Sequence, residues 1–187
     1  MPWNSLISLP PDSPLTMNNG ENNPTDGNSS IEVRLANDSD HAALRELFQE
    51  GVIEGQVPYN DTGADIDNLQ EGYFNDEGSS AFWVAIHKDK VIGMIGVQKT
   101  ADNSAEIRRL RVRKDHRRRG VGTRLLECAL NFCREHGYLK IVLDVRIERG
   151  PAITMFEKFG FVLSRTRDIG GRKMLDFYLD LYREPQS

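Results

Sequence analysis

The sequence lacks an apolar run long enough to span a membrane as a helix. The short apolar patch at residues 6–9 has no basic residue before it and is broken by Pro10 and Pro11, which is not the pattern of a secretory signal. Cysteine is also scarce. The 2 cysteines, Cys128 and Cys133, lie in one predicted helix and point in different directions, so neither a disulfide between them nor a metal pair is expected. Reduced, packed thiols suit a reducing compartment, and we expect a cytoplasmic protein without a membrane partner.

Basic residues are absent from residues 1–30, which are rich in Asn, Ser, Pro and Gly. This composition predicts a disordered tail over residues 1–30 and a single folded domain over residues 31–187. The formal net charge is −4, and the three acidic residues of the tail supply −3 of it, so the folded part is nearly neutral. A nearly neutral domain argues against a protein that binds nucleic acid through its overall charge.

Hydrophobic periodicity predicts alternating strands and helices through the rest of the chain. Asn37, Asp38 and Ser39 are candidate caps of the first helix. The order of elements is β-α-α-β-β-β-α-β-α-β-β, which predicts an α/β fold with a mixed sheet and helices on both faces. The expected helices cover residues 42–48, 64–74, 121–136 and 150–160, and the expected strands cover residues 31–35, 81–86, 91–98, 106–112, 139–145, 161–165 and 173–181.

The most informative stretch is residues 106–123. It combines a strand, a cationic loop, the glycines Gly120 and Gly122, and the start of a helix. A helix start presents unpaired backbone N–H groups and the positive end of a dipole, and glycine lets a ligand approach that backbone closely. Neighbouring arginines add directed donors. Together these features predict a site for a phosphate-bearing ligand.

The strand in this stretch breaks its own alternation. Ile107 is apolar, and the next apolar residues are Leu110 and Val112, so one extra residue must be absorbed. This predicts a β-bulge near Arg108 and Arg109. Backbone groups left unpaired at a bulge can hydrogen-bond an extended ligand.

Eight of the twelve residues from 108 to 119 are Lys or Arg. Three interpretations compete: a localisation or nucleic-acid patch, a solvated strand face, and a phosphate cradle. Arg111 and Arg113 fit the solvated strand face. Residues 117–119 adjoin the glycine pair and fit the phosphate cradle.

The glycine pair also partly matches the dinucleotide-binding fingerprint G-x-G-x-x-G. The third glycine position falls on Leu125, where close helix–strand packing requires Gly or Ala. The residues before Gly120 form an arginine-rich loop and not the end of an apolar strand. Asp144 does lie at a suitable distance along the chain, so this interpretation stays open as an alternative.

The pattern Arg117-x-x-Gly120-x-Gly122 resembles the (Gln/Arg)-x-x-Gly-x-(Gly/Ala) signature of the GCN5-related N-acetyltransferases, the GNAT superfamily. Residues 152–161 resemble the second signature of that family, and the order of elements resembles its fold from residue 31 to residue 181. The resemblance implies a mixed, mostly antiparallel sheet with a bulged, splayed fourth strand. It also implies acetyl-CoA as cosubstrate, an amine as acceptor, and no metal.

The same resemblance implies where the cofactor lies. The pantetheine arm is expected to pair with the backbone of Leu110, Arg111 and Val112. Arg149 stands where the family often has an Asn that contacts pantetheine, and Phe156 stands where it often has a Tyr that acts as general acid. The pyrophosphate is expected in the loop formed by Arg117, Arg118, Arg119, Gly120, Val121, Gly122 and Thr123.

The implied chemistry is direct transfer. A neutral amine attacks the thioester, so a base must remove a proton. Glu106 precedes Gly120 by the spacing of the catalytic glutamate in the histone-modifying branch of the family, which implies that Glu106 is the base. The resemblance places the Leu110 N–H at the developing oxyanion. Phe156 cannot donate a proton, but a thiol pKa of about 8.5 lets the thiolate leave without an acid.

The resemblance implies an acceptor groove between residues 51–66 and residues 166–172. Residues 51–77 hold seven acidic residues and no Lys or Arg, which indicates either solvated helix faces or a surface that attracts a cationic amine. We expect a primary amine acceptor, on a small molecule or a peptide. Two alternatives stay open: a CoA-binding regulatory or interaction module with little turnover, and a nucleic-acid-associated protein that uses residues 108–119. The oligomeric state is also open, with a homodimer as one option.

Overall fold

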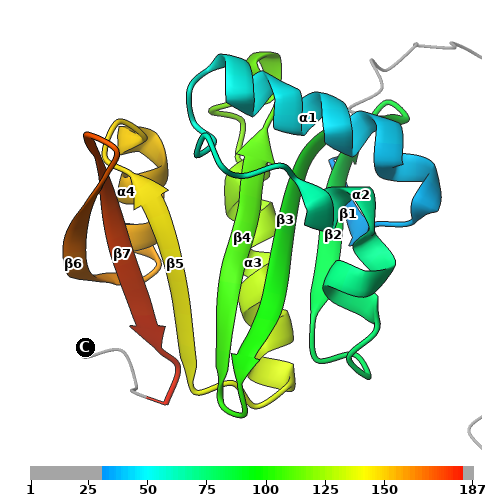
Figure 1. Ribbon diagram of the computed structural model, residues 1–187. Coiled ribbons are helices and arrows are strands. Elements are labelled where there is room, and N and C mark those ends of the chain that lie inside the picture. The colour runs from blue at the N-terminus through cyan, green and yellow to red at the C-terminus, as the bar shows by residue number, and fades with distance from the viewer. Residues whose placement is uncertain (1–30, 183–187) are drawn as a thin grey trace, which may run out of the picture.

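The structure is a computed structural model that describes residues 31–182. In this part of the chain seven strands form one sheet in the order β1-β2-β3-β4-β5-β7-β6 (Figure 1). All neighbouring strands are antiparallel except β4 and β5, which are parallel. The mixed, mostly antiparallel sheet confirms the predicted fold class. The strands are β1 (Glu32–Leu35), β2 (Ala81–His87), β3 (Lys90–Ala101), β4 (Ser104–Val112), β5 (Lys140–Arg146), β6 (Val162–Ile169) and β7 (Arg172–Asp180).

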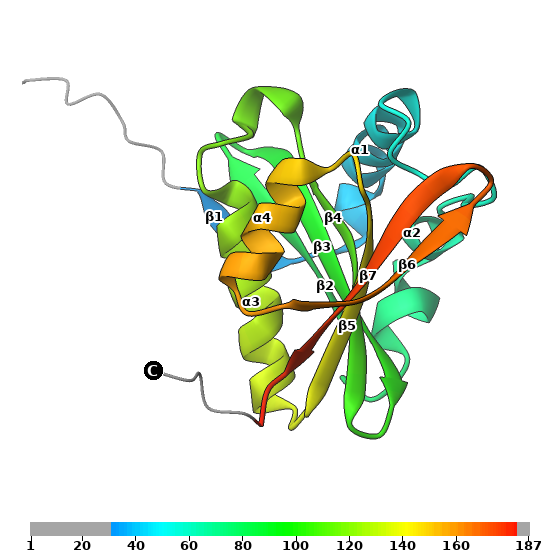
Figure 2. The same cartoon turned by 90° about the vertical axis from the view of Figure 1, so that its left-hand side faces the viewer.

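Helices cover both faces of the sheet, as predicted. Figures 1 and 2 show α1 and α2 on one face and α3 and α4 on the other. The helix expected over residues 64–74 is instead two short pieces, because Asn68 leaves the helical backbone with φ −134° and ψ 77°. The helices are α1 (His41–Ile53), α2 (Ala64–Asp67), α3 (Val121–Glu135) and α4 (Gly150–Lys158). Two short 3-10 helices, η1 (Asp38–Asp40) and η3 (Lys114–His116), and a short π-helix, η2 (Gln70–Phe74), complete the set in residues 31–182.

Each face of the sheet has its own hydrophobic core. Asn37 and Asp40 form a capping box that starts the segment leading into α1, and α1 then buries Leu44, Leu47 and Phe48 against the sheet. On the other face α3 buries the stripe that its periodicity predicts. Cys133 belongs to this second core, and burial raises its pKa to about 12, as expected for an inert, packed thiol.

The predicted tail over residues 1–30 lies outside the described residues. Within residues 31–182, no helix is both long and apolar enough to cross a membrane.

The predicted bulge is confirmed in β4. Gly96 of β3 pairs with Arg108, and Met94 pairs with Arg111, so one more residue lies on β4 than on β3. Arg109 carries the extra length with φ +60°, a left-handed conformation that is uncommon outside glycine. The bulge reverses the alternation, so that Ile107 and Leu110 both reach the core beneath α3.

The strands β4 and β5 pair only at their start. The ladder covers Ser104 to Glu106 of β4 and Lys140 to Val142 of β5. Beyond these residues the two strands diverge (Figure 1). The second half of β4 therefore faces β5 without a strand partner, which is the splay that the resemblance implied.

Candidate active site

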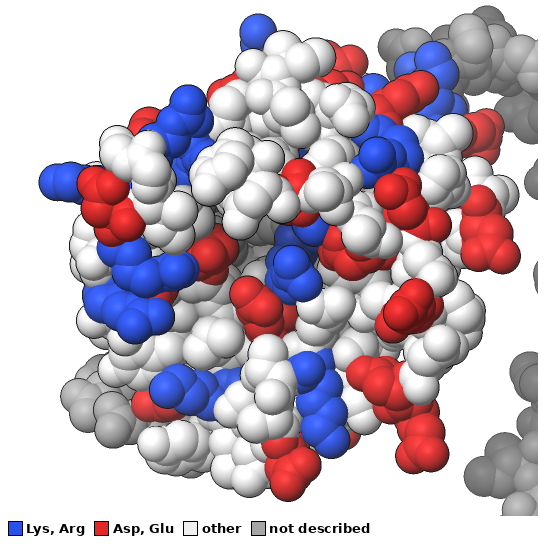
Figure 3. Space-filling view, viewed as in Figure 1, with Lys and Arg blue, Asp and Glu red and all other residues white. Residues whose placement is uncertain are grey.

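A cavity of about 530 Å³ lies where β4 and β5 diverge. Its walls come mainly from the α1–α2 loop, β4, β5 and α4 with the residue before it. In Figure 3, which views the α1 and α2 face, acidic and basic side chains surround a hollow beneath α1. Among the lining residues are Glu106, Leu110, Arg111, Arg146, Arg149 and Phe156. Five of these six were expected at the site; Arg146 was not.

Glu106 is half-buried at the last position where β4 still pairs with β5. Burial raises the pKa of its carboxyl group, the Arg108 guanidinium 4.0 Å away acts in the opposite direction, and the negative charge of Asp144 raises the pKa further. The net effect is a pKa above the ordinary value. A carboxylate with a raised pKa is a stronger base than an exposed one, so Glu106 can accept a proton here.

The unpaired half of β4 offers backbone carbonyls that side chains now occupy. The Nη2 atom of Arg149 donates to the Leu110 carbonyl at 3.2 Å, and the Nε atom of Arg117 donates to the Val112 carbonyl at 2.9 Å. Both carbonyls lie beyond the β4–β5 ladder. They can therefore receive donors from an extended ligand in the manner of an added strand.

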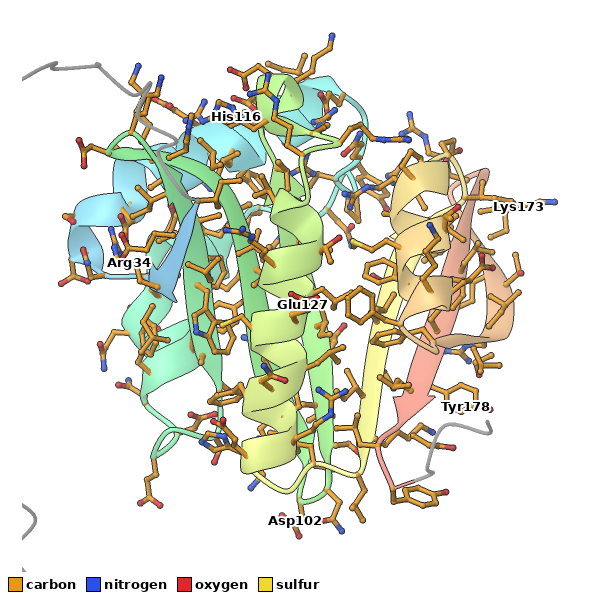
Figure 4. The ribbon with its side chains drawn as sticks, turned by 180° about the vertical axis from the view of Figure 1, so that it is seen from behind. Arg34, Asp102, His116, Glu127, Lys173 and Tyr178 are labelled. Atoms are coloured by element: carbon orange, nitrogen blue, oxygen red, sulfur yellow. The ribbon has the colours of Figure 1, made fainter. Side chains whose placement is uncertain are left out.

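The cationic loop lies beyond the cavity, at the end of the sheet where α3 begins. Figure 4 shows His116 of η3 at this end, with α3 running away from it. Gly120 precedes α3 with φ +79°, a left-handed conformation that favours glycine. Arg118 and Arg119 are exposed beside it, whereas Val121 is buried in the core. The Thr123 hydroxyl faces Met155 of α4, with 3.9 Å between Oγ1 and Sδ. Neither Val112 nor any residue of 117–123 lines the cavity.

The expectation that Arg111 and Arg113 belong to a solvated strand face is wrong, and Arg109 is not solvated either. Arg109 lies between two aspartates, with Nη1 at 2.5 Å from Asp61 and Nη2 at 2.5 Å from Asp65. Arg111 is 6 % exposed, and its side chain extends from β4 toward α1, where the guanidinium lies against Gly51. The guanidinium of Arg113 contacts two carboxylates of α1, Glu46 and Glu50, each at 2.7 Å.

The acidic residues of 51–77 are accordingly not merely solvated. Burial raises the pKa of Asp61, but the hydrogen bonds and the charge of Arg109, together with a hydrogen bond from the Gly63 N–H, hold the pKa below its usual value. Glu54 accepts two hydrogen bonds of 2.8 Å from Arg117, which lowers its pKa as well. Arginines of residues 106–123 thus neutralise several of the acidic residues of 51–77. Arg109, Arg113 and Arg117 are therefore paired with carboxylates, whereas Arg118 and Arg119 are exposed beside Gly120.

One wall of the expected acceptor groove is present and the other is displaced. Residues of the α1–α2 loop line the cavity, whereas the β6–β7 turn does not. Arg172 at that turn donates to the Gly55 carbonyl at 3.1 Å, so the turn closes against the loop. Phe156, at the expected general-acid position, is 4 % exposed and packs edge-on against Phe161 with 5.7 Å between ring centroids.

The sequence model of the Acetyltransferase (GNAT) family matches residues 41–161. The chain belongs to this family. Its sheet is not the doubly wound parallel sheet that a dinucleotide-binding fingerprint requires, so that alternative is wrong.

Two relatives show how far the similarity extends. N-acetyltransferase 8 of Homo sapiens is 31 % identical over 102 residues, which are 52 % of this chain and 44 % of the relative. N-acetyltransferase 8 of Rattus norvegicus is 29 % identical over 102 residues, 52 % of this chain and 46 % of the relative. The chain thus matches somewhat less than half the length of these relatives.

Solved structures share the fold over most of the chain. An acetyltransferase of the GNAT family from Staphylococcus aureus Mu50 superposes with a TM-score of 0.72 at 20 % identity, covering 81 % of this chain and 99 % of the other. YncA from Salmonella typhimurium, solved with its cofactor acetyl-CoA, superposes with a TM-score of 0.71 at 20 % identity, covering 83 % and 96 %.

Arg146 is one of the lining residues that the sequence did not predict, and it is the buried cation among them. It directly follows the nearly continuous apolar run of residues 139–145, and no role was predicted for it. The usable signal was alternation, because Asp144 and Arg146 lie two residues apart and so on the same face of β5, whereas Leu143 and Val145 face the α3 core.

Proposed function

We propose that this protein is an acetyl-CoA-dependent N-acetyltransferase that transfers the acetyl group directly to a primary amine. The observation that carries the proposal is Glu106, a half-buried carboxylate with a raised pKa, on the same cavity as the unpaired half of β4. A base, a strand edge for an extended ligand and a helix start preceded by glycine lie in sequence order along one stretch.

The described residues fit acetyl-CoA. Its pantetheine amides would replace Arg149 and Arg117 as the donors to the Leu110 and Val112 carbonyls. Its pyrophosphate would bind at the α3 start, where backbone N–H groups follow Gly120 and the exposed Arg118 and Arg119 supply positive charge. The acetyl-CoA in the similarly folded YncA supports this assignment.

The chemistry then follows from the cavity. The nitrogen lone pair of a neutral amine attacks the thioester carbon, and negative charge develops on the carbonyl oxygen, where we assign the Leu110 N–H as donor. Glu106 takes the proton that the nitrogen loses, directly or through one water. The carbon–sulfur bond breaks when the intermediate collapses, and the thiolate carries the electron pair away.

A CoA-binding module with little turnover is the alternative, and Phe156 is the observation that favours it. The side chain is buried and has no proton to give, so the expected general acid is missing. Thiolates are good leaving groups at neutral pH, however, which makes loss of this acid tolerable. The alternative also gives no reason for a raised pKa at Glu106.

Release of CoA from acetyl-CoA across a panel of primary amines tests the proposal, with Glu106→Gln as the decisive variant. We expect this variant to lose about 100-fold or more in kcat, because a positioned base contributes 10²–10⁴. Its Kd for CoA should change less than about threefold. Glu127→Gln is the matched control, since Glu127 lies exposed on α3, on the opposite face (Figure 4).

The outcomes separate the candidates. CoA binding without turnover on any amine would favour the regulatory module. Turnover that Glu106→Gln leaves unchanged would show that another group is the base. A cytoplasmic location, a homodimeric state and the absence of nucleic-acid and membrane partners stay predictions from the sequence.

A further inference from the structure

Arg146 is a buried cation without a counterion. It is 8 % exposed and lines the cavity. Its Nη2 atom donates to the Val57 carbonyl at 3.3 Å, and its Nε atom is buried with no hydrogen-bond partner. Among residues 31–182, no carboxylate forms an ion pair with it. Burying an arginine in this way is costly unless something supplies the missing charge and acceptors.

Two further arginines on the cavity are weakly compensated. Among the described residues Arg111 forms an ion pair only with Glu54, at 3.7 Å, and Glu54 is already engaged by Arg117 at 2.8 Å. Glu50 acts on Arg111 only through its charge. Arg149 donates to a neutral backbone carbonyl. Burial and the neighbouring Arg149 lower the pKa of Arg111 to about 10, which is the effect of a cationic cluster short of anions.

This shortage is local. Arg109, which also lines the cavity, contacts two aspartates, and elsewhere on the same face Arg113 contacts two glutamates and Arg34 contacts Asp40 at 2.8 Å. The chain therefore supplies carboxylates to its other buried and half-buried arginines. The missing anion at the cavity points to a ligand.

The cofactor does not provide that anion at the right place. The phosphates of CoA would lie at residues 117–123, outside the cavity, and the acetyl-bearing end of CoA is uncharged. Arg146 shares a face of β5 with Asp144, and both line the cavity with Glu106, so Arg146 lies on the side where the proposed amine acceptor would bind. Asp144 and Arg146 are separated by about 7 Å along the strand, a distance that a small molecule spans.

We propose that the acceptor is a small amine that also carries an oxyanion, a carboxylate or a phosphate, and that Arg146 binds this group. The inference rests on the proposed N-acetyltransferase function and adds the substrate class. The acidic pair Glu106 and Asp144 receives the amine, and Arg146 with Arg149 and Arg111 receives the anion. The planar guanidinium of Arg146 has unused donors in the fork geometry that suits both kinds of oxyanion.

Matched acceptor pairs test the proposal on the full chain saturated with acetyl-CoA. L-phenylalanine and L-alanine are each compared with their α-carboxamides, and O-phosphoethanolamine is compared with ethanolamine. For each acceptor, kcat/KM is calculated from the concentration of the neutral, unprotonated amine. We expect a preference of about 10- to 100-fold for the anionic member of at least one pair, which also distinguishes carboxylate from phosphate. In Arg146→Gln this ratio should collapse to within about threefold. It should persist in Arg124→Gln, which alters an exposed arginine on α3.

A binding measurement keeps the test independent of turnover. Sodium propionate should raise the Tm of the CoA-saturated wild type more than propionamide does, and sodium phosphate serves as the probe for the other oxyanion. This anion-specific shift should vanish in Arg146→Gln and be retained in part in Arg146→Lys. Without anions, Arg146→Gln should be at least as stable as the wild type, because it removes an uncompensated buried charge.

The two proposals fail in different ways. Efficient acetyl transfer with equal rates for anionic and neutral acceptors would overturn the oxyanion site and leave the acetyltransferase standing. An anion-specific Tm shift lost in Arg146→Gln, together with no transfer to any amine, would support the site and overturn the proposed function. Equal stabilisation of wild type and Arg146→Gln by propionate and by phosphate would overturn the site whatever the activity.

Discussion

The guanidinium of Arg111 lies against the backbone of Gly51, in the space that a Cβ at position 51 would fill. Arg111 comes from β4 and Gly51 from the buried side of α1, so the glycine lets a charged side chain pass between helix and sheet. Glycine inside a helix normally costs about 0.5–1 kcal/mol relative to alanine. Its presence here is explained by the close approach of Arg111, which holds one wall of the cavity.

Gly51→Ala is therefore expected to destabilise the protein, against the usual helix preference. Overpacking of a tight site costs about 1–3 kcal/mol, and displacing Arg111 disturbs the charge balance with Glu54. Gly122→Ala is the control, because a Cβ there would meet only ordinary contacts, with Met155 Sδ at 3.6 Å. Urea unfolding without CoA should show a loss for Gly51→Ala and a gain or no change for Gly122→Ala. Equal gains in both would mean that Arg111 moves aside freely.

A second prediction concerns the aspartates that hold the bulge. Asp65 accepts hydrogen bonds from Arg109 and, at 2.6 Å, from the Tyr73 hydroxyl. Burial raises the pKa of Asp65, but these hydrogen bonds and the positive charges of Arg109 and Arg108 together leave the pKa below its usual value. A lowered folded pKa gives stability that is fully present above the unfolded pKa of about 4 and is lost as the pH falls through the folded pKa.

Asp65→Asn should thus cost about 1–3 kcal/mol in the free energy of unfolding at pH 7, since Arg109 keeps Asp61 as a partner. The difference from wild type should shrink as the pH falls below about 4. Asp67→Asn alters an exposed pair with Arg45 at 3.1 Å and should cost less than about 1 kcal/mol. A difference at Asp65 that does not change with pH would show that its charge is not what stabilises the bulge.

A third prediction uses the pair Asp144 and Glu106. The negative charge of Asp144 contributes to the raised pKa of Glu106. Since Glu106 acts as a base only when ionised, kcat/KM should fall as the pH drops through this pKa. Asp144→Asn removes a repelling charge, so the acid limb of the pH profile should move to lower pH.

Asp144 and Asp176 both contact Arg167, at 3.2 and 2.6 Å. Asp176→Asn is therefore the control for loosening Arg167 without removing the charge beside Glu106. Its acid limb should stay at the wild-type position when both are measured with the same acceptor. A limb that moves equally in both variants would assign the effect to Arg167 and not to the Asp144 charge.

The features that could be predicted from the sequence, such as the bulge in β4 and the start of α3, are those that depend on neighbouring residues. The break in alternation between Ile107 and Leu110 placed the bulge, because a two-residue period cannot absorb an extra residue in any other way. The glycine pair placed the start of α3, since backbone conformation there is decided by Gly120 itself. Both features depend only on neighbouring residues, so they can be predicted without knowledge of the fold.

The electrostatics of the site could not be predicted in this way. Arg109 and Asp65 are 44 residues apart, and the pairing depends on how α2 packs over the bulge. A run of arginines on a strand and a run of acids on a helical segment each looked solvated on their own. Arg146 was missed for the same reason: only the assembled cavity shows that it is buried and lacks a carboxylate.

A fourth prediction concerns the general acid that was expected at position 156, and Phe156→Tyr tests whether its absence limits the rate of acetyl transfer. The substitution adds a hydroxyl to the cavity wall next to Leu110 and Arg149. We expect kcat to change less than about threefold, because the thiolate of CoA is a good leaving group near its pKa of about 8.5. We also expect a stability loss of about 1–3 kcal/mol, because the buried hydroxyl has to find a partner against the Phe161 ring.

The control for this variant is Phe159→Tyr, which adds a hydroxyl at the end of the same helix, away from the cavity lining. Single-turnover measurements isolate the transfer step from CoA release. A gain of tenfold or more for Phe156→Tyr but not for Phe159→Tyr would contradict unassisted departure. Phe156 would then limit the rate of acetyl transfer in this protein, and the CoA-binding module with little turnover would become the favoured function.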